Sequence, residues 1–315
     1  MNEEEIIKYL DDLENQVKND PSNTRIKRVF ADALLEHNLP ERALEQYNYL
    51  LKLFANDAAI HFNIGIIYEK LKNPELAENA YKKAIELSPD DPDFHYNLAF
   101  LYEQKGESSK AIDEYLTTLE LEEEDPNAHF NLACLYIKQN RNQEAVEHFK
   151  TTIKLNYDDI YAHFYLAYEY KKAGETEKAL EEYNIVTTLN PDYSWAYYNI
   201  ACILYGQGKT IEAIENLKKT VSLNPKDIDA YKTLATIMIS TKDYASLLNY
   251  LETAVMENPD NGDIHYIIAL TYKSLNETED AVFHLEKALS LQDTLSVPQS
   301  QLLAEIESVK KLQTS

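Results

Sequence analysis

A small residue recurs every 34 residues along this chain without interruption. The positions are Ala31, Gly65, Ala99, Ala133, Ala167, Ala201, Ala235 and Ala269. A fixed period between about 20 and 50 residues is typical of stacked repeat proteins, in which each repeat buries its apolar face against its neighbours. The period therefore predicts one array of eight repeats, with a long concave surface, rather than two globular domains.

Each repeat is predicted to contain two helices joined by a tight turn. In the third repeat, residues 92–104 place Leu98, Leu101 and Tyr102 at helical spacing, and residues 109–121 form a second amphipathic segment around Tyr115. The turn position should adopt the left-handed conformation that ends many helices, which Gly and Asn favour. Six of its eight occupants are Gly or Asn: Asn38, Lys72, Gly106, Asn140, Gly174, Gly208, Lys242 and Asn276.

The small residues have a mechanical reason, because a larger side chain would force the two helices of a repeat apart. A second row of alanines does the same on the second helix: Ala43, Ala77, Ala111, Ala145, Ala179, Ala213 and Ala281. Leu247 interrupts that row in the seventh repeat. Aromatic side chains are expected to fill the complementary spaces, with Tyr47, Tyr81, Tyr115, Phe149 and Tyr183 on the second helix.

This pattern resembles the tetratricopeptide repeat family, whose 34-residue repeat has small residues at positions 8 and 20, Tyr at 11, an aromatic residue near 24 and Pro at 32. The resemblance implies an all-α, right-handed α-solenoid of stacked helix-turn-helix repeats. Eight repeats should occupy residues 24–295, starting near residues 24, 58, 92, 126, 160, 194, 228 and 262. Residues 1–23 and 296–315 should form the N-terminal and C-terminal capping helices that such a stack needs for solubility.

The charge of the chain limits the partners that it can attract. Asp and Glu number 54 against 30 Lys and Arg, a formal net charge of −24. This balance argues against nucleic acid, whose phosphates require basic residues, and against anionic membrane surfaces. It favours a basic protein or peptide. With no apolar run that could span a bilayer and an acidic start unlike a secretory signal, we expect a cytoplasmic protein. Cys134 and Cys202, two repeats apart, are expected to be free thiols.

The family resemblance also implies where a partner binds. In this family the first helix of each repeat lines the concave surface, and ligands are generally peptides or protein segments. The aromatic and asparagine residues on that face in repeats two to six are Phe62, Asn63, Tyr96, Asn97, Phe130, Asn131, Tyr161, Phe164, Tyr168, Trp195, Tyr198 and Asn199. Aromatic faces would supply apolar contact, and amides would hold a peptide backbone. The alternative is that the aromatics are partly buried between adjacent repeats; we take groove lining as the working hypothesis, because exposed aromatic rows usually mark a site.

Three other patterns in the sequence do not indicate a metal site, a phosphate-binding loop or a catalytic site. A histidine row at position 4 (His61, His95, His129, His163 and His265) has members about 10 Å apart, too far to share a metal ion, so we expect structural imidazoles. Gly206–Thr210 lacks the first glycine and the preceding strand of a phosphate-binding loop. No nucleophile and base share one repeat at a reachable spacing, so the sequence predicts neither an enzyme nor a bound cofactor or metal.

The sequence therefore predicts a non-enzymatic scaffold or adaptor that binds an extended peptide or partner protein in its concave groove. Two alternatives stay open: a substrate-recruiting accessory subunit of a separately encoded enzyme, and a self-associating structural repeat protein. We expect a monomer, with a homo-oligomer not excluded. The carboxylate clamp of co-chaperones in this family is disfavoured, because Asp32 and Asp93 are acidic where the clamp requires Asn and Lys.

Overall fold

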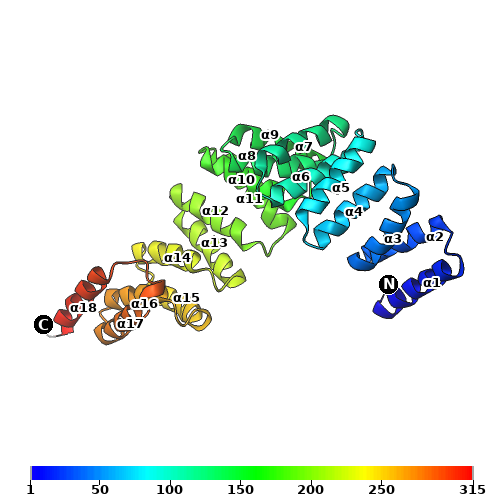
Figure 1. Ribbon diagram of the computed structural model, residues 1–315. Helices are drawn as coiled ribbons and strands as arrows, with labels where there is room; N and C mark the ends of the chain where they lie inside the picture. The colour runs from blue at the N-terminus through cyan, green and yellow to red at the C-terminus, as the bar shows by residue number, and fades with distance from the viewer. Residues whose placement is uncertain (1, 314–315) are drawn as a thin grey trace. The chain divides into compact units, whose positions relative to one another are not determined.

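The computed structural model describes residues 2–313, which contain eighteen α-helices, one short 3-10 helix and no strand. The helices pair as antiparallel hairpins, and within each of two compact units consecutive helices lie against one another (Figure 1). The all-α class and the architecture of stacked helix hairpins are thus confirmed. The chain divides into two compact units, with Tyr157 closing the N-terminal unit and Asp158 opening the C-terminal unit.

The N-terminal unit consists of one single helix and four helix hairpins. The helices are α1 (Glu3–Asn19), α2 (Thr24–Glu36), α3 (Pro40–Leu53), α4 (Ala58–Lys70), α5 (Pro74–Leu87), α6 (Pro92–Gln104), α7 (Ser108–Leu121), α8 (Pro126–Lys138) and α9 (Asn142–Leu155). Helix α1 packs on α2 and buries Leu10, Leu13 and Val17 against the first hairpin. Proline opens α3 and α5, a position where its missing N–H costs nothing.

The C-terminal unit consists of four hairpins followed by a last helix. The helices are α10 (Ile160–Lys172), α11 (Thr176–Leu189), α12 (Ser194–Gly206), α13 (Thr210–Leu223), α14 (Ile228–Ser240), α15 (Tyr244–Glu257), α16 (Gly262–Ser274), α17 (Thr278–Ser290), the 3-10 helix η1 (Gln292–Thr294) and α18 (Gln299–Gln313). Helix α18 packs on α17 and buries Leu302, Ile306 and Val309 there.

The turn between the two helices of each hairpin has the left-handed conformation that the Gly and Asn pattern predicts. All eight turn positions have φ between 56° and 79°. The prediction is therefore confirmed, and it extends to Lys72 and Lys242, whose backbones adopt this conformation at φ 56° and 60°. The pairing of the two helices imposes the left-handed backbone conformation on the turn residue, and at these two positions a lysine adopts it.

Close approach of the paired helices explains the two rows of small residues. The first-helix alanines are at most 2% exposed, and each second-helix alanine is fully buried. At Gly65 the ring of Tyr81 lies where a side chain would begin: a Cβ there would sit 2.5 Å from Tyr81 Cδ1 and Cε1. A larger residue at these positions would therefore push the helices apart.

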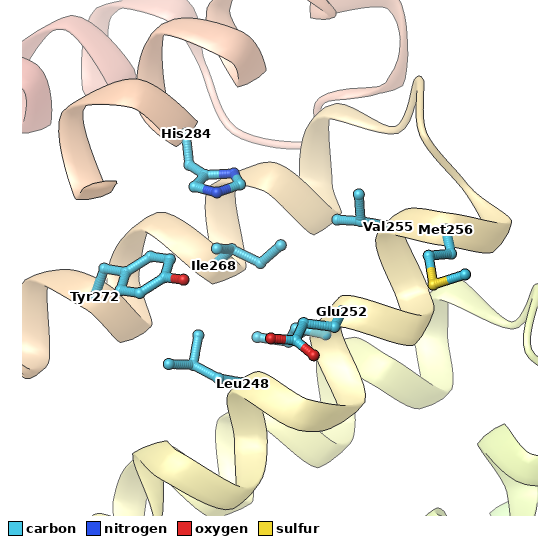
Figure 2. Close-up of a pocket in the computed structure, with 8 residues that line it drawn as sticks. Leu248, Glu252, Val255, Met256, Ile268, Tyr272 and His284 are labelled. Atoms are coloured by element: carbon cyan, nitrogen blue, oxygen red, sulfur yellow. The ribbon is translucent and has the colours of Figure 1, made fainter. Parts of the chain in front are cut away.

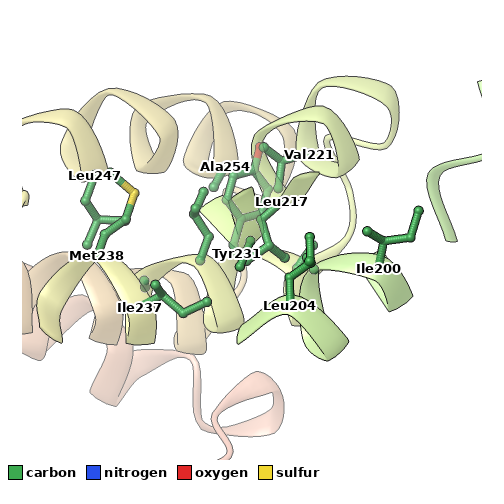
Figure 3. Close-up of a cluster of buried hydrophobic side chains, with 14 of the residues drawn as sticks. Ile200, Leu204, Leu217, Val221, Tyr231, Ile237, Met238, Leu247 and Ala254 are labelled. Carbon is green, nitrogen blue, oxygen red and sulfur yellow. The ribbon is translucent and has the colours of Figure 1, made fainter. Parts of the chain in front are cut away.

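The seventh hairpin departs from this rule, as the sequence indicates. Leu247 of α15 is fully buried in a large apolar cluster that also contains Met238 of α14 (Figure 3). Helices α14 and α15 are in close approach over less of their length than the helices of any other hairpin. The bulk of Leu247 accounts for this wider spacing, because every other second helix has alanine at that position.

Candidate functional site

An open cavity of about 460 Å³ lies on α10 and α12 of the C-terminal unit. Six of its eight lining side chains are aromatic. The full lining is Phe164, Tyr165, Tyr168 and Lys171 from α10, Tyr193 from the turn before α12, and Trp195, Tyr198 and Asn199 from α12. We call this cavity the aromatic groove.

Helical periodicity brings these side chains together. On α10, residue 161 is followed at three and four positions by residues 164 and 165, these by residue 168 at four and three, and residue 168 by residue 171 at three, so the five lie on one face of the helix. Residues 195, 198 and 199 do the same on α12. The opposite faces bury small and aliphatic residues such as Ala167 and Ala201. Tyr165, Tyr168 and Trp195 therefore point towards solvent, whereas Phe164 and Tyr198 are half-buried and also pack against the edge of the apolar core.

The rings of the groove meet mostly edge to face, the arrangement that aromatic pairs prefer. Phe164 forms the half-buried base: its ring centroid lies 5.5 Å from that of Tyr183 and 5.2 Å from that of Tyr193. Trp195 and Tyr198 meet at 6.5 Å with their planes 80° apart. Trp195 is 55% exposed and Tyr168 is 42% exposed, so the groove presents unusually large apolar surfaces to solvent.

One end of the groove is polar. Lys171 Nζ donates to Asn199 Oδ1 over 2.9 Å, and Asn199 Nδ2 donates to the Trp195 carbonyl over 2.8 Å. Both ends of the Asn199 amide are therefore used inside the protein. Burial raises the pKa of Tyr193 and that of Tyr198, so both phenols are neutral hydrogen-bonding groups at physiological pH.

Most predicted site residues of the C-terminal unit gather in this groove. Phe164, Tyr168, Trp195, Tyr198 and Asn199 line it. Tyr161, 59% exposed, lies beside it, with its ring 6.3 Å from that of Tyr193. The structure brings together residues that are more than 30 positions apart in the sequence.

The predicted aromatics of the N-terminal unit are half-buried; each packs on a ring of a second helix, and Phe62 also packs on Phe94 of the next first helix, α6. The centroid distances are 5.7 Å for Phe62–Tyr81, 4.8 Å for Phe62–Phe94, 5.5 Å for Tyr96–Tyr115 and 5.7 Å for Phe130–Phe149. These rings pack inside the protein and also expose one edge to solvent. Groove lining and burial between repeats, the two alternatives that the sequence leaves open, therefore each describe part of their environment.

The asparagines of the same unit donate to groups inside the protein. Asn63 Nδ2 donates to Tyr47 Oη over 2.8 Å, and Asn131 Nδ2 donates to the phenol oxygens of Tyr96 and Tyr115 over 3.0 and 3.1 Å. Asn97 Nδ2 instead donates to the Asp93 carbonyl of its own helix over 2.8 Å. The side-chain amides of these asparagines therefore donate their hydrogen bonds to tyrosine hydroxyls or to a carbonyl of their own helix.

Three groove residues were not among the predicted ones. Tyr165 occupies the position that is asparagine in four other repeats, and Lys171 occupies a contact position whose occupants share no chemistry. Tyr193 lies in the turn before α12, outside the first-helix pattern altogether. The density of aromatics between residues 157 and 205 was the available signal for all three.

A second cavity, of about 340 Å³, lies among α15, α16 and α17. Figure 2 shows its lining, in which aliphatic side chains surround Glu252, Tyr272 and His284. Met256 at its edge is 81% exposed. This cavity is smaller than the aromatic groove, and its lining is mainly aliphatic. Part of that lining comes from α15, the second helix of the seventh hairpin.

The histidine row is structural, and each described member has a definite role. The Nε2 atoms of His61, His95, His129 and His265 lie 2.9–3.2 Å from backbone carbonyls six residues earlier. The Nδ1 atoms of four members, His95, His129, His163 and His265, face the residue 19 positions later, which is Glu114, His148, Glu182 and His284 respectively. Among the described residues, no group of three metal-ligating side chains is assembled.

Comparison with known proteins identifies the repeat. Models described as "TPR repeat" match residues 75–106 and 167–208, and models described as "Tetratricopeptide repeat" match residues 92–125, 126–159, 196–227 and 262–294. Together these matches cover more than half of the chain. The chain belongs to the tetratricopeptide repeat family. No curated protein matches the sequence.

Solved structures of tetratricopeptide repeat proteins share the fold. MamA is 25% identical with a TM-score of 0.50, over 53% of this chain and 97% of its own. YrrB, described as a TPR protein with an unusual peptide-binding site, is 21% identical with a TM-score of 0.55, over 59% of this chain and 96% of its own. The C-terminal part of a TPR repeat-containing protein from Cytophaga hutchinsonii is 16% identical with a TM-score of 0.57, over 85% and 96%.

These findings give this tetratricopeptide repeat protein the fold of protein-interaction scaffolds. Within residues 2–313, no helix combines the length and the apolar character needed to cross a membrane.

Proposed function

We propose that this protein is a non-catalytic interaction scaffold that binds an extended peptide, or an extended segment of a partner protein, in the aromatic groove of α10 and α12. The observation that carries the proposal is the gathering of six aromatic side chains around one open cavity. Large, partly exposed rings lose little rotamer entropy on binding and dominate the energy of many interfaces. Soluble proteins rarely expose such a patch without a partner.

The shape of the groove suits an elongated ligand. Tyr161 lies in the first turn of α10 and Lys171 in its last, so the face between them is roughly 15 Å long at 1.5 Å per residue. An extended chain advances about 3.3 Å per residue, so four or five residues would cover this face. The same ligand class is supported by YrrB, a protein of the same fold that is described as having a peptide-binding site.

Site-specific photo-crosslinking tests the proposal. A photoreactive amino acid replaces Tyr168 in the groove and, as a matched control, Phe283 on α17, which is 62% exposed. We expect crosslinked partners from native lysate at position 168, their loss when Trp195→Ala is added, and none of the same partners at position 283. Equal capture at both positions, or capture that Trp195→Ala leaves unchanged, would contradict a groove-based function.

The same experiment separates the three roles that the sequence leaves open. A crosslinked enzyme whose turnover depends on Trp195 would identify an accessory subunit that recruits substrates. A crosslinked second copy of this chain, together with a dimer mass in light scattering, would identify self-association. A different, non-enzymatic protein would identify the scaffold that we propose.

A further inference from the structure

The aromatic groove carries a positive charge although the chain as a whole is strongly negative. Of its eight lining residues, Lys171 is charged and none is acidic. The hydrogen bond from Lys171 goes to the neutral amide of Asn199. The ammonium group is thus held in place at the groove wall by a partner that leaves its charge uncompensated.

The nearest carboxylate on the same helix is already paired. Glu169 is 3% exposed, and both of its oxygens accept from Lys172 Nζ, over 3.0 and 3.2 Å. An ion pair of adjacent charges has little field at a distance. Glu169 and Lys172 therefore neutralise each other. The carboxylate of Asp229 on α14 acts on the Tyr198 phenol from outside the lining, and it lies 4.0 Å from Lys232 Nζ. Lys171 is thus the charged side chain of the groove lining itself.

The local charge outweighs the net charge at this site. Exposed charges more than about 8 Å apart are largely screened at physiological ionic strength. The acidic excess of the chain therefore guides the approach of a partner, whereas the residues that touch the ligand decide which side chain is accepted. Beside Lys171, that side chain is a carboxylate.

We propose that the aromatic groove selects segments in which an apolar or aromatic anchor lies within about five residues of a side-chain carboxylate that pairs with Lys171. This inference rests on the proposed function and adds the chemistry of the ligand. The anchor occupies the rings between Tyr161 and Tyr198, and the carboxylate reaches the lysine at the C-terminal end of α10. The five-residue limit follows from the roughly 15 Å between the two ends.

A displayed peptide library tests the charge preference directly. Random 12-residue peptides are fused to the N-terminus of a phage coat protein, so that no peptide offers a terminal carboxylate. The library is selected on the full-length protein, on Lys171→Glu, on Trp195→Ala and on Lys154→Glu. Lys154, exposed in the last turn of α9, gives a control with the same change in net charge, also in the last turn of a helix.

The expected result is enrichment of Asp or Glu near an aromatic or aliphatic residue for the wild type and for Lys154→Glu. Lys171→Glu should instead enrich Lys or Arg at the same spacing, and Trp195→Ala should lose the enriched set. A wild type that enriches basic residues, or a charge preference that Lys171→Glu leaves unchanged, would overturn the inference while leaving a peptide groove. An enriched set that survives Trp195→Ala, or no enriched set, would overturn the proposed function itself.

A charge-exchange cycle with one selected peptide makes the result quantitative. Replacing its acidic residue by Asn should weaken binding to the wild type about tenfold, a typical range for one charge-assisted contact. The same replacement should leave Kd for Lys171→Glu nearly unchanged or improved. Circular dichroism melting of each variant shows that the protein is folded, and additive effects of the two changes would contradict direct pairing.

Discussion

Among single residues, Gly65 and Tyr81 show how one small side chain directs a hydrogen-bond network. Because Gly65 leaves room, the Tyr81 ring lies over it and its hydroxyl donates to Glu69. In the first and third repeats the equivalent tyrosines, Tyr47 and Tyr115, accept from an asparagine of the next repeat. The corresponding Asn97 does not bond to the Tyr81 hydroxyl, which donates to Glu69, and instead donates to the Asp93 carbonyl of its own helix.

Gly65→Ala is expected to destabilise the protein by about 1–3 kcal/mol, as overpacking a core does. The new Cβ would meet the Tyr81 ring at 2.5 Å and displace its hydroxyl from the partly buried Glu69. The higher helix propensity of alanine than of glycine offsets at most about 1 kcal/mol of this loss in stability. Urea unfolding measures the change. Gly206→Ala is the matched control, since no atom lies within 4 Å of a Cβ there; a Gly65 variant as stable as that control would contradict the packing argument.

The His129–His148 pair makes a second prediction at this scale, because the two Nδ1 atoms lie 2.7 Å apart. Burial and the neighbouring His129 lower the pKa of His148 to about 4. An unfolded histidine has a pKa near 6.5, so below that pH the unfolded chain binds a proton at His148 that the folded protein does not bind. The contribution of neutral His148 to the free energy of unfolding is therefore fully present above about pH 6.5 and is lost progressively as the pH falls towards 4. Acidification from pH 7.5 to 5 should thus destabilise the wild type.

His148→Gln removes this linked proton, and it should lose roughly 1–2 kcal/mol less stability than the wild type over the same pH step. Glutamine keeps a donor and an acceptor near His129. Urea unfolding at pH 7.5 and at pH 5 measures both proteins. Parallel losses in the two proteins would show that this pair does not drive the pH dependence.

Among the helices, the hairpin pattern was predictable from the sequence and its exceptions were only partly so. Helical periodicity, the turn residues and the rows of alanines are local signals, and the positive φ at Lys72 follows from the period rather than from lysine itself. The groove depended on the turn before α12, where Tyr193 comes to lie between Phe164 and Tyr161. The equivalent position is Asp or Asn in the turns before the other first helices from α4 to α16, and it lies outside the helix face that the prediction considered; for this reason Tyr193 was missed.

Leu247 gives the prediction that belongs to the hairpin. It is fully buried, and α14 and α15 have adapted to its volume. Leu247→Ala therefore creates a cavity rather than restoring the common packing, and we expect a loss of about 2–4 kcal/mol. The reciprocal change Ala213→Leu, in the closely packed sixth hairpin, should also destabilise, by about 1–3 kcal/mol. Thermal and urea unfolding test both, and a Leu247→Ala variant of wild-type stability would show that the helices close freely.

For the whole molecule, the acidic excess is the property that no single contact explains. With 54 acidic and 30 basic residues, at least 24 carboxylates have no basic side chain of their own even if every Lys and Arg is paired. Most of the ion pairs are exposed and contribute about 0–1 kcal/mol each. Mutual repulsion of the remaining acids opposes the folded state.

Salt should therefore stabilise this protein. Raising the ionic strength from about 0.01 M to about 0.1 M shortens the screening length from about 30 Å to about 10 Å, which removes long-range repulsion before it weakens ion pairs at contact distance. We expect Tm to rise by several degrees over this range with NaCl, and to the same extent with KCl, because screening depends on ionic strength rather than on the cation. A Tm that falls with salt would mean that the exposed ion pairs outweigh the repulsion among the acidic residues.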